Sequence, residues 1–199
     1  MAGSSGGLGA GQFGQVALGH ALLAACAVLY LAWWWVFFRP GAAGPTGALR
    51  AVGVACIVGA AALGVASVTV TLSALGGLPS ERHALPGAVI AAAGAVAYAV
   101  LAAVTAGALR RPVTTELLLI VGWATMEAAV VSTLWATAAV STGRLAALGA
   151  LAALVFAASL ICYVLYYRLG PWPSFVDGMV PLGSVGVLSA IEAAALAVL

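Results

Sequence analysis

Six apolar runs, each about as long as a membrane is thick, make up most of the chain. A helix needs about 20 apolar residues to cross the hydrocarbon core of a bilayer. The runs cover residues 16–38, 49–75, 86–109, 115–139, 145–167 and 178–199. An isolated strand cannot satisfy its backbone in lipid, so each run is predicted to be a helix. The sequence therefore predicts an all-α integral membrane protein, a bundle of about six transmembrane helices in a single polytopic domain over residues 1–199.

The composition indicates what surrounds the protein. With 65% apolar and 6% charged residues, the 199-residue chain has too little polar surface to coat a water-soluble globule. The net charge of +2 is too small to suggest a nucleic-acid partner. All basic residues are arginines, and alanine, glycine and valine dominate, as is typical of GC-rich bacterial genes. We expect a multi-pass protein of the bacterial inner (cytoplasmic) membrane whose main partner is the lipid bilayer.

Proline and glycine separate the runs. The segment 170–175, GPWPSF, contains two prolines, so we expect it to be non-helical and the sixth helix to begin at about Gly178. Residues 80–85 are expected to form a short solvated loop. The first run ends in Trp33, Trp34 and Trp35, which are predicted to anchor the helix at the membrane–water boundary.

The arginines predict the orientation of the chain. The first, third and fifth connections contain five of them, Arg39, Arg50, Arg110, Arg111 and Arg168. The second and fourth connections contain only two, Arg82 and Arg144. Because cytoplasmic loops carry the excess of basic residues, the odd connections should be cytoplasmic and both termini non-cytoplasmic.

Three ionisable side chains lie deep within the apolar runs, namely His20, Glu127 and Glu192. At 1.5 Å per residue they lie roughly 27, 20 and 22 Å from the predicted cytoplasmic ends of their helices. An ionisable group at such depth is expensive and marks a candidate functional site. Trp123 and Trp135 lie on a stripe with Glu127 at helical spacings and join it as candidate ligand-contacting residues. We therefore predict an ion- or substrate-binding site at these five positions.

Each of the three ionisable residues also has a structural interpretation. Glu127 in a neutral form needs only a hydrogen bond from a neighbouring group. His20 lies near the start of the sequence and Glu192 about two turns from its end, so either side chain can reach interfacial water. The sequence leaves both interpretations open.

No motif in the sequence indicates an enzyme. HExxH, GxSxG and paired-aspartate patterns are absent, so no catalytic residue is assigned. Cys26, Cys56 and Cys162 form no cluster with histidine and are expected to pack as small buried residues, without a metal site. His83 lies in a loop, which disfavours a bis-histidine haem, and no lysine is present to hold retinal. No cofactor is predicted.

Three functions compete on this basis. The first is a small transporter or channel for a proton, a cation or a small, largely apolar compound, with Glu127 as the key group. The second is a non-catalytic membrane subunit whose small-residue faces bind a second copy or a partner subunit. The third is an intramembrane enzyme acting on a lipid. The identity of the ion or ligand is not encoded in any motif.

The predicted orientation is testable at the second connection. Cysteines introduced one at a time between Ser80 and Leu85 should react with a membrane-impermeant thiol reagent added to the outside of intact cells. Reaction only in inside-out vesicles would reverse the orientation.

Overall fold

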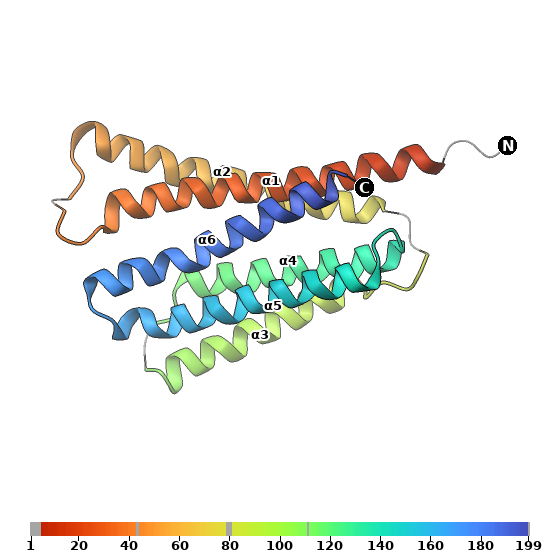
Figure 1. The fold of residues 1–199 in the computed structure, drawn as a ribbon. Coiled ribbons are helices and arrows are strands. Elements are labelled where there is room, and N and C mark those ends of the chain that lie inside the picture. Colours follow the sequence, from red (N-terminus) through yellow and green to blue (C-terminus); the bar gives the residue numbers. More distant parts are fainter. Residues whose placement is uncertain (1–4, 43, 79–80, 111, 199) are drawn as a thin grey trace. The chain divides into compact units, whose positions relative to one another are not determined.

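A computed structural model describes residues 5–42, 44–78, 81–110 and 112–198, with side chains of the first helix from residue 11 on. Pro79, Ser80, Arg111 and Leu199, which fall in predicted connections or at the predicted end of the sixth span, lie outside the described residues. The described helices are α1 (Ser5–Phe38), α2 (Gly47–Gly77), α3 (Gly87–Gly107), α4 (Thr115–Thr137), α5 (Thr142–Leu165), the 3-10 turn η1 (Tyr166–Arg168) and α6 (Pro171–Leu196) (Figure 1).

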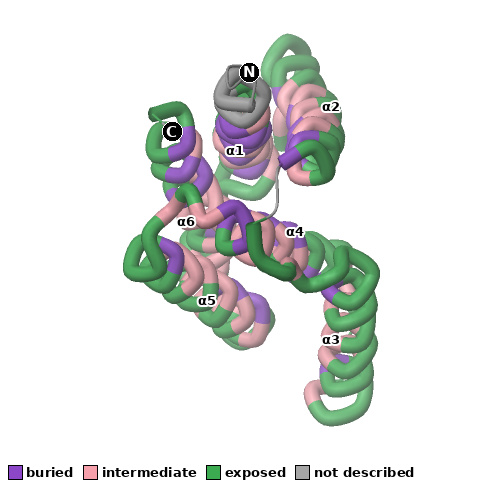
Figure 2. Tube along the Cα trace, turned by 90° about the vertical axis from the view of Figure 1, so that its right-hand side faces the viewer, coloured by how far each residue is buried: buried purple, intermediate pink, exposed green. Residues whose placement is uncertain are grey.

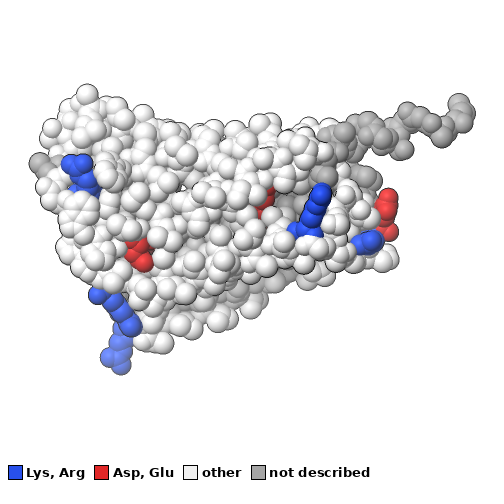
Figure 3. All heavy atoms as spheres, in the orientation of Figure 1, with Lys and Arg blue, Asp and Glu red and all other residues white. Residues whose placement is uncertain are grey.

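The six α-helices confirm the predicted fold class. All six are long and apolar enough to cross a membrane. Large apolar side chains point outward along them, and Val65, for example, is 70% exposed. On the face drawn in Figure 3, the basic side chains gather near helix ends and the long sides of the helices are almost free of charge. Such a surface fits lipid and not water, so the chain is a multi-pass membrane protein.

Two predicted helix starts are wrong. The first helix already runs from Ser5, and α6 begins at Pro171 instead of about Gly178. Prolines fit the first turn of a helix because the N–H groups there have no partner within the helix. The segment 171–175 is therefore helical despite its two prolines. A third proline, Pro181, lies inside α6, and the nearby Ser184 hydroxyl donates to the Val180 carbonyl at 2.8 Å.

The chain divides into two compact units. Unit 1 comprises the residues up to Leu78 and from Val164 on, and so contains α1, α2, η1 and α6. Unit 2 comprises Pro79–Tyr163 and contains α3, α4 and most of α5. The single polytopic domain stays a prediction.

In unit 1, α1 packs against both α2 and α6. At small residues on each helix, a side chain or the backbone of the neighbouring helix packs closely. Gly19, Gly64 and Gly53 lie against Thr71, Cys26 and Phe37 respectively, and Gly186 and Gly178 on α6 lie against Ala27 and Trp34. These contacts run in opposite directions along the paired helices, so α1 is antiparallel to α2 and to α6. The buried residues of α2 lie on the side of the helix that faces α1, as Figure 2 shows. Small residues at such a contact let the backbones of two membrane helices approach closely.

An aromatic cluster closes one end of unit 1. The Trp34 indole is buried, and its Nε1–H donates to the Phe175 carbonyl at 3.1 Å. Its ring stacks on Phe38 and on Phe175, with centroid separations of 4.5 and 6.4 Å. The predicted anchoring role is therefore wrong for Trp34, which holds α1 to α6. The exposed Trp35, with Arg39 above its ring at 5.7 Å, has the surroundings of an interfacial anchor.

In unit 2, an apolar core joins α3, α4 and α5. Leu117, Val121 and Tyr163 form its centre, and partly buried apolar residues of α3 and α5 surround them. The loop before α3 is fastened to the end of α4, because the backbone N–H groups of Glu81 and Arg82 both donate to the Ala136 carbonyl at 2.9 and 3.0 Å. That carbonyl is in the last turn of α4, where the helix itself supplies no donor. The loop residues Glu81, Arg82 and His83 are exposed, as expected.

The glycine contacts between α1 and α6 predict a position-specific loss of stability. A Cβ at Gly186 would lie 2.9 Å from the Ala27 Cβ, which cannot rotate away, whereas a Cβ at Gly183 meets nothing within 4 Å. Gly186→Ala should therefore destabilise the protein by about 1–3 kcal/mol. Gly183→Ala, one turn away, should be neutral or stabilising by up to about 1 kcal/mol. Thermal unfolding in detergent compares the two, and equal stabilities would contradict the close contact.

Candidate functional site: a buried histidine–glutamate pair

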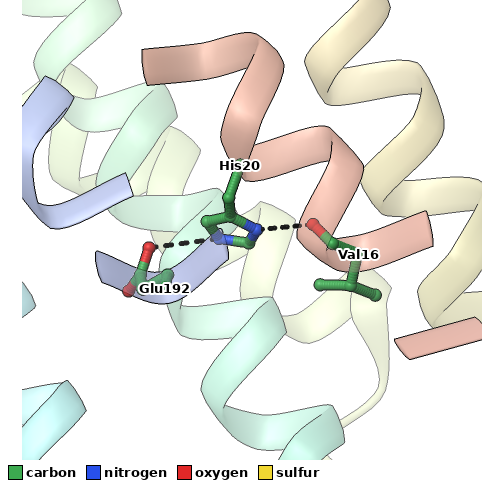
Figure 4. Close-up of polar contacts among 3 residues, drawn as sticks. All are labelled: Val16, His20 and Glu192. Carbon is green, nitrogen blue, oxygen red and sulfur yellow. Dashed lines mark hydrogen bonds and ion pairs between the residues drawn. The ribbon is translucent and has the colours of Figure 1, made fainter. Parts of the chain in front are cut away.

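His20 lies on α1 with its side chain completely buried. Its Nδ1 is 2.8 Å from the carbonyl oxygen of Val16, one turn earlier in the same helix (Figure 4). A carbonyl oxygen only accepts hydrogen bonds, so Nδ1 must carry a proton. This bond fixes both the ring orientation and the tautomer, and it leaves Nε2 as the atom that gains or loses a proton.

Nε2 of His20 faces the carboxyl group of Glu192 on α6. The distance from Nε2 to Oε2 is 3.2 Å, and Glu192 is only 2% exposed. One shared proton allows two forms, an imidazolium that donates to a carboxylate or a carboxylic acid that donates to a neutral imidazole. Both forms have zero net charge, and removing the shared proton leaves a net charge of −1. This arrangement would allow the pair, within a helical contact of unit 1, to hold one exchangeable proton.

Three hydroxyl-bearing residues of unit 1 are also fully buried, namely Ser67 and Thr71 on α2 and Ser189 on α6. Thr71 packs against Gly19, the residue before His20 in the chain. Ser67 lies one turn before Thr71 on the same face of α2, and Ser189 lies one turn before Glu192. We call the five residues His20, Ser67, Thr71, Ser189 and Glu192 the polar layer. Its members come from all three long helices of unit 1.

The other acidic residue of α6 is remote from the pair. Asp177 precedes Glu192 by fifteen residues, which corresponds to about 22 Å along a helix.

The remaining predicted site residues lie on α4 in unit 2. Glu127 is buried, and so is Trp123 one turn earlier. Trp135 is 41% exposed, and the Arg82 guanidinium lies 5.4 Å from its ring centroid. Trp135 therefore supports the loop before α3, and a ligand-binding role for it stays a prediction. The proposed coupling of Glu127 to His20 or Glu192 also stays a prediction.

Ser67 and Thr71 were not among the site residues predicted from the sequence. A pattern in the sequence could have indicated them, because the small residues Gly53, Ala60, Ser67 and Ala74 recur at intervals of seven residues, and the structure buries all four. Small residues at this spacing lie on one face of a helix and are typical of a face that packs closely against another helix. Ser67 belongs to this series and Thr71 follows it by one turn, so both are expected on the packed face.

Comparison with known proteins adds no assignment to the site. No protein-family model matches the chain, and neither a curated protein nor a solved structure is found to match it. The function must therefore be argued from the polar layer itself.

The pairing of His20 with Glu192 predicts energetic coupling between them. His20→Ala or Glu192→Ala alone leaves the other side chain without its buried partner and should cost about 3–5 kcal/mol. The double variant should cost at least about 1 kcal/mol less than the sum of the two single losses. Unfolding in detergent measures the cycle. The matched cycle of His20 with Asp177 should be additive, and equal behaviour of the two cycles would argue against the pairing.

Proposed function

We propose that this protein is a small membrane transporter or channel that moves protons, alone or together with a cation or a small, largely apolar solute. The observation that carries the proposal is the His20–Glu192 pair, buried at 3.2 Å in a helical contact of a membrane-spanning unit. Ionisable groups are rare within membrane spans because burying them costs free energy, and they mark ion pathways and proton relays. A pair that holds one exchangeable proton is the simplest such element.

The composition of the spans supports this class of solute. Sugars and other heavily hydroxylated compounds require many hydrogen-bonding side chains, and the spans supply few. Uptake of one proton changes the net charge of the pair from −1 to zero. This change gives the protein two charge states, and a proton or cation moving across the membrane requires such states.

Glu127 is proposed as a second carboxylate in the same process. Its predicted depth differs from that of His20 and Glu192 by no more than about two helical turns. A further carboxylate at such a depth would accept the proton that leaves the pair. This part of the proposal rests on the sequence.

The orientation and the assembly are likewise proposed on sequence grounds. They comprise location in the bacterial inner membrane, both termini outside, and either a homo-oligomer or a partner membrane subunit. The main competing function, a non-catalytic subunit, would use the same pair only to hold α1 and α6 together. It predicts that the pair affects stability and leaves proton flux unchanged.

Proton flux in liposomes separates the two functions. An imposed pH gradient should collapse faster in the presence of the wild-type protein, as reported by an enclosed pH-sensitive dye. Glu192→Gln and Glu127→Gln keep the shape of the side chain but cannot ionise, so each should reduce the flux by about a hundredfold. Glu81→Gln, in the exposed loop before α3, is the matched control and should leave the flux unchanged.

Thermal unfolding of the same variants shows whether a variant with reduced proton flux is still folded. Full flux in a folded Glu192→Gln variant would refute proton handling by the pair and favour the subunit function. Loss of flux in Glu192→Gln with normal flux in Glu127→Gln would restrict the site to unit 1.

A further inference from the structure

A shallow groove follows the first turns of α6. It has a volume of about 500 Å³, is open to its surroundings and is lined by residues of unit 1, namely Leu169, Trp172, Pro173, Val176, Asp177 and Val180. Helical periodicity places the lining residues of α6 on the side opposite to Phe175, Gly178 and Gly186, which contact α1. Trp172 and Val176 are 54% and 56% exposed, so the groove stays accessible when α6 packs on α1.

Asp177 alone is ionisable among the described residues that line the groove. Its side chain is half-buried. It lies six residues after Pro171, beyond the first turn in which a helix dipole stabilises an acidic group. Aspartate also has a low propensity for the interior of a helix. Neither the helix end nor helix propensity therefore accounts for a carboxylate at this position of a membrane-spanning helix.

A carboxylate between apolar walls favours a positively charged ligand. A partly desolvated site strengthens the attraction between opposite charges. In the described part of the chain no basic side chain lines the groove, and Arg168, the nearest basic residue in sequence, is exposed. The indole of Trp172 offers a second attraction, because the face of this ring binds cations. Its edge contact with Phe175, at a centroid separation of 5.9 Å, supports the ring beside the groove.

The lining favours an organic cation over a metal ion. A calcium or magnesium ion is held by several oxygen ligands, whereas every lining residue except Asp177 has an apolar or aromatic side chain. The volume of about 500 Å³ is typical of sites for small organic molecules. Aliphatic or aromatic substituents of a cation would bury apolar surface against these walls.

The position of the groove along α6 suits a ligand that carries both a charge and an apolar body. The 26 residues of α6 extend over roughly 39 Å, more than the hydrocarbon core of about 30 Å, so the first turns of the helix reach the membrane boundary. Trp35 and Arg39 of the aromatic cluster, which contacts Phe175, have the surroundings of that boundary. A cation can thus approach Asp177 from the boundary while its apolar part stays in hydrocarbon.

We propose that this groove binds a monovalent organic cation with an apolar body, with Asp177 beside the charge, Trp172 over it and the apolar walls around the body. The biological role of this site rests on the proposed function, because the inference names the solute that would accompany protons. The binding itself is a property of unit 1 and is measured without proton flux.

Equilibrium dialysis of tritiated tetraphenylphosphonium against the full-length protein in lipid nanodiscs tests the proposal, with uptake by empty nanodiscs subtracted. Wild type should bind the ion saturably. Asp177→Asn keeps the shape of the side chain and removes its charge, so it should weaken binding by at least about fivefold. Trp172→Leu keeps an apolar wall and removes the indole face, so it should weaken binding by about two- to fivefold.

Matched controls exist for both the protein and the ligand. Glu81→Gln removes a carboxylate from an exposed loop, and Val187→Ala shortens an exposed side chain of α6 outside the groove, so both should bind as wild type does. Tetraphenylborate has nearly the same shape as tetraphenylphosphonium and a negative charge. Asp177→Asn should therefore leave binding of this anion unchanged or strengthen it.

Three results would overturn the inference. They are absence of saturable binding in wild type, equal affinities of wild type and folded Asp177→Asn, and binding in detergent that disappears in lipid nanodiscs, which would assign the groove to lipid. If Asp177→Asn does not fold, the wild-type protein decides, because saturable binding of tetraphenylborate as tight as that of tetraphenylphosphonium contradicts a cation site.

Glu192→Gln separates this inference from the proposed function. Retained tetraphenylphosphonium binding together with lost proton flux supports both. Retained binding with normal flux supports the groove and refutes the function. Absence of binding in wild type, combined with loss of flux in Glu192→Gln, overturns the groove and leaves the proposed function standing.

Discussion

A polar group buried in a membrane must meet another polar group, and this requirement fixes how α1 lies against α6. His20 and Glu192 meet at 3.2 Å, and the two helices run in opposite directions. Ala27 and Trp34 follow His20 at intervals of seven residues and meet Gly186 and Gly178 on α6. Sliding either helix by one turn would separate the pair and place side chains where glycines now stand. The ionisable contact and the close contacts thus specify the same register.

Hydroxyl groups buried in a membrane also require a polar partner. In lipid, a serine or threonine normally satisfies itself on the preceding turn of its own helix, as Thr69 on the exposed side of α2 does. Ser67 and Thr71 on the buried side of α2 depart from that rule at the level of His20. The five buried residues of the polar layer come from α1, α2 and α6, and buried apolar residues such as Val16, Ala60 and Ala74 lie on α1 and α2.

Much of this arrangement could be predicted from the sequence, since hydrophobic length alone decides whether a helix can span a membrane. Depth along the helix predicted similar levels for His20, Glu127 and Glu192, and the structure places His20 at 3.2 Å from Glu192. Burial of Trp34 was missed because an aromatic residue near a helix end looks the same in sequence whether it faces headgroups or a glycine such as Gly178. The sequence predicts a later start for α6 because two prolines are typical of a break between helices, although in a first turn they cost no hydrogen bond. Ser67 and Thr71 were missed because their significance depends on which helix they face.

Pro181 has a mechanical consequence for α6. It lies between the aromatic end of the helix, held at Phe175 and Gly178, and the polar end, held at Glu192. A proline inside a helix has no N–H to donate to the carbonyl four residues earlier, and helices bend at such positions with little further cost. The turn before Pro181 is therefore held by one backbone hydrogen bond fewer than the rest of α6. Bending of α6 costs least at this turn, which lies between the contact of Gly178 with Trp34 and the contact of Gly186 with Ala27.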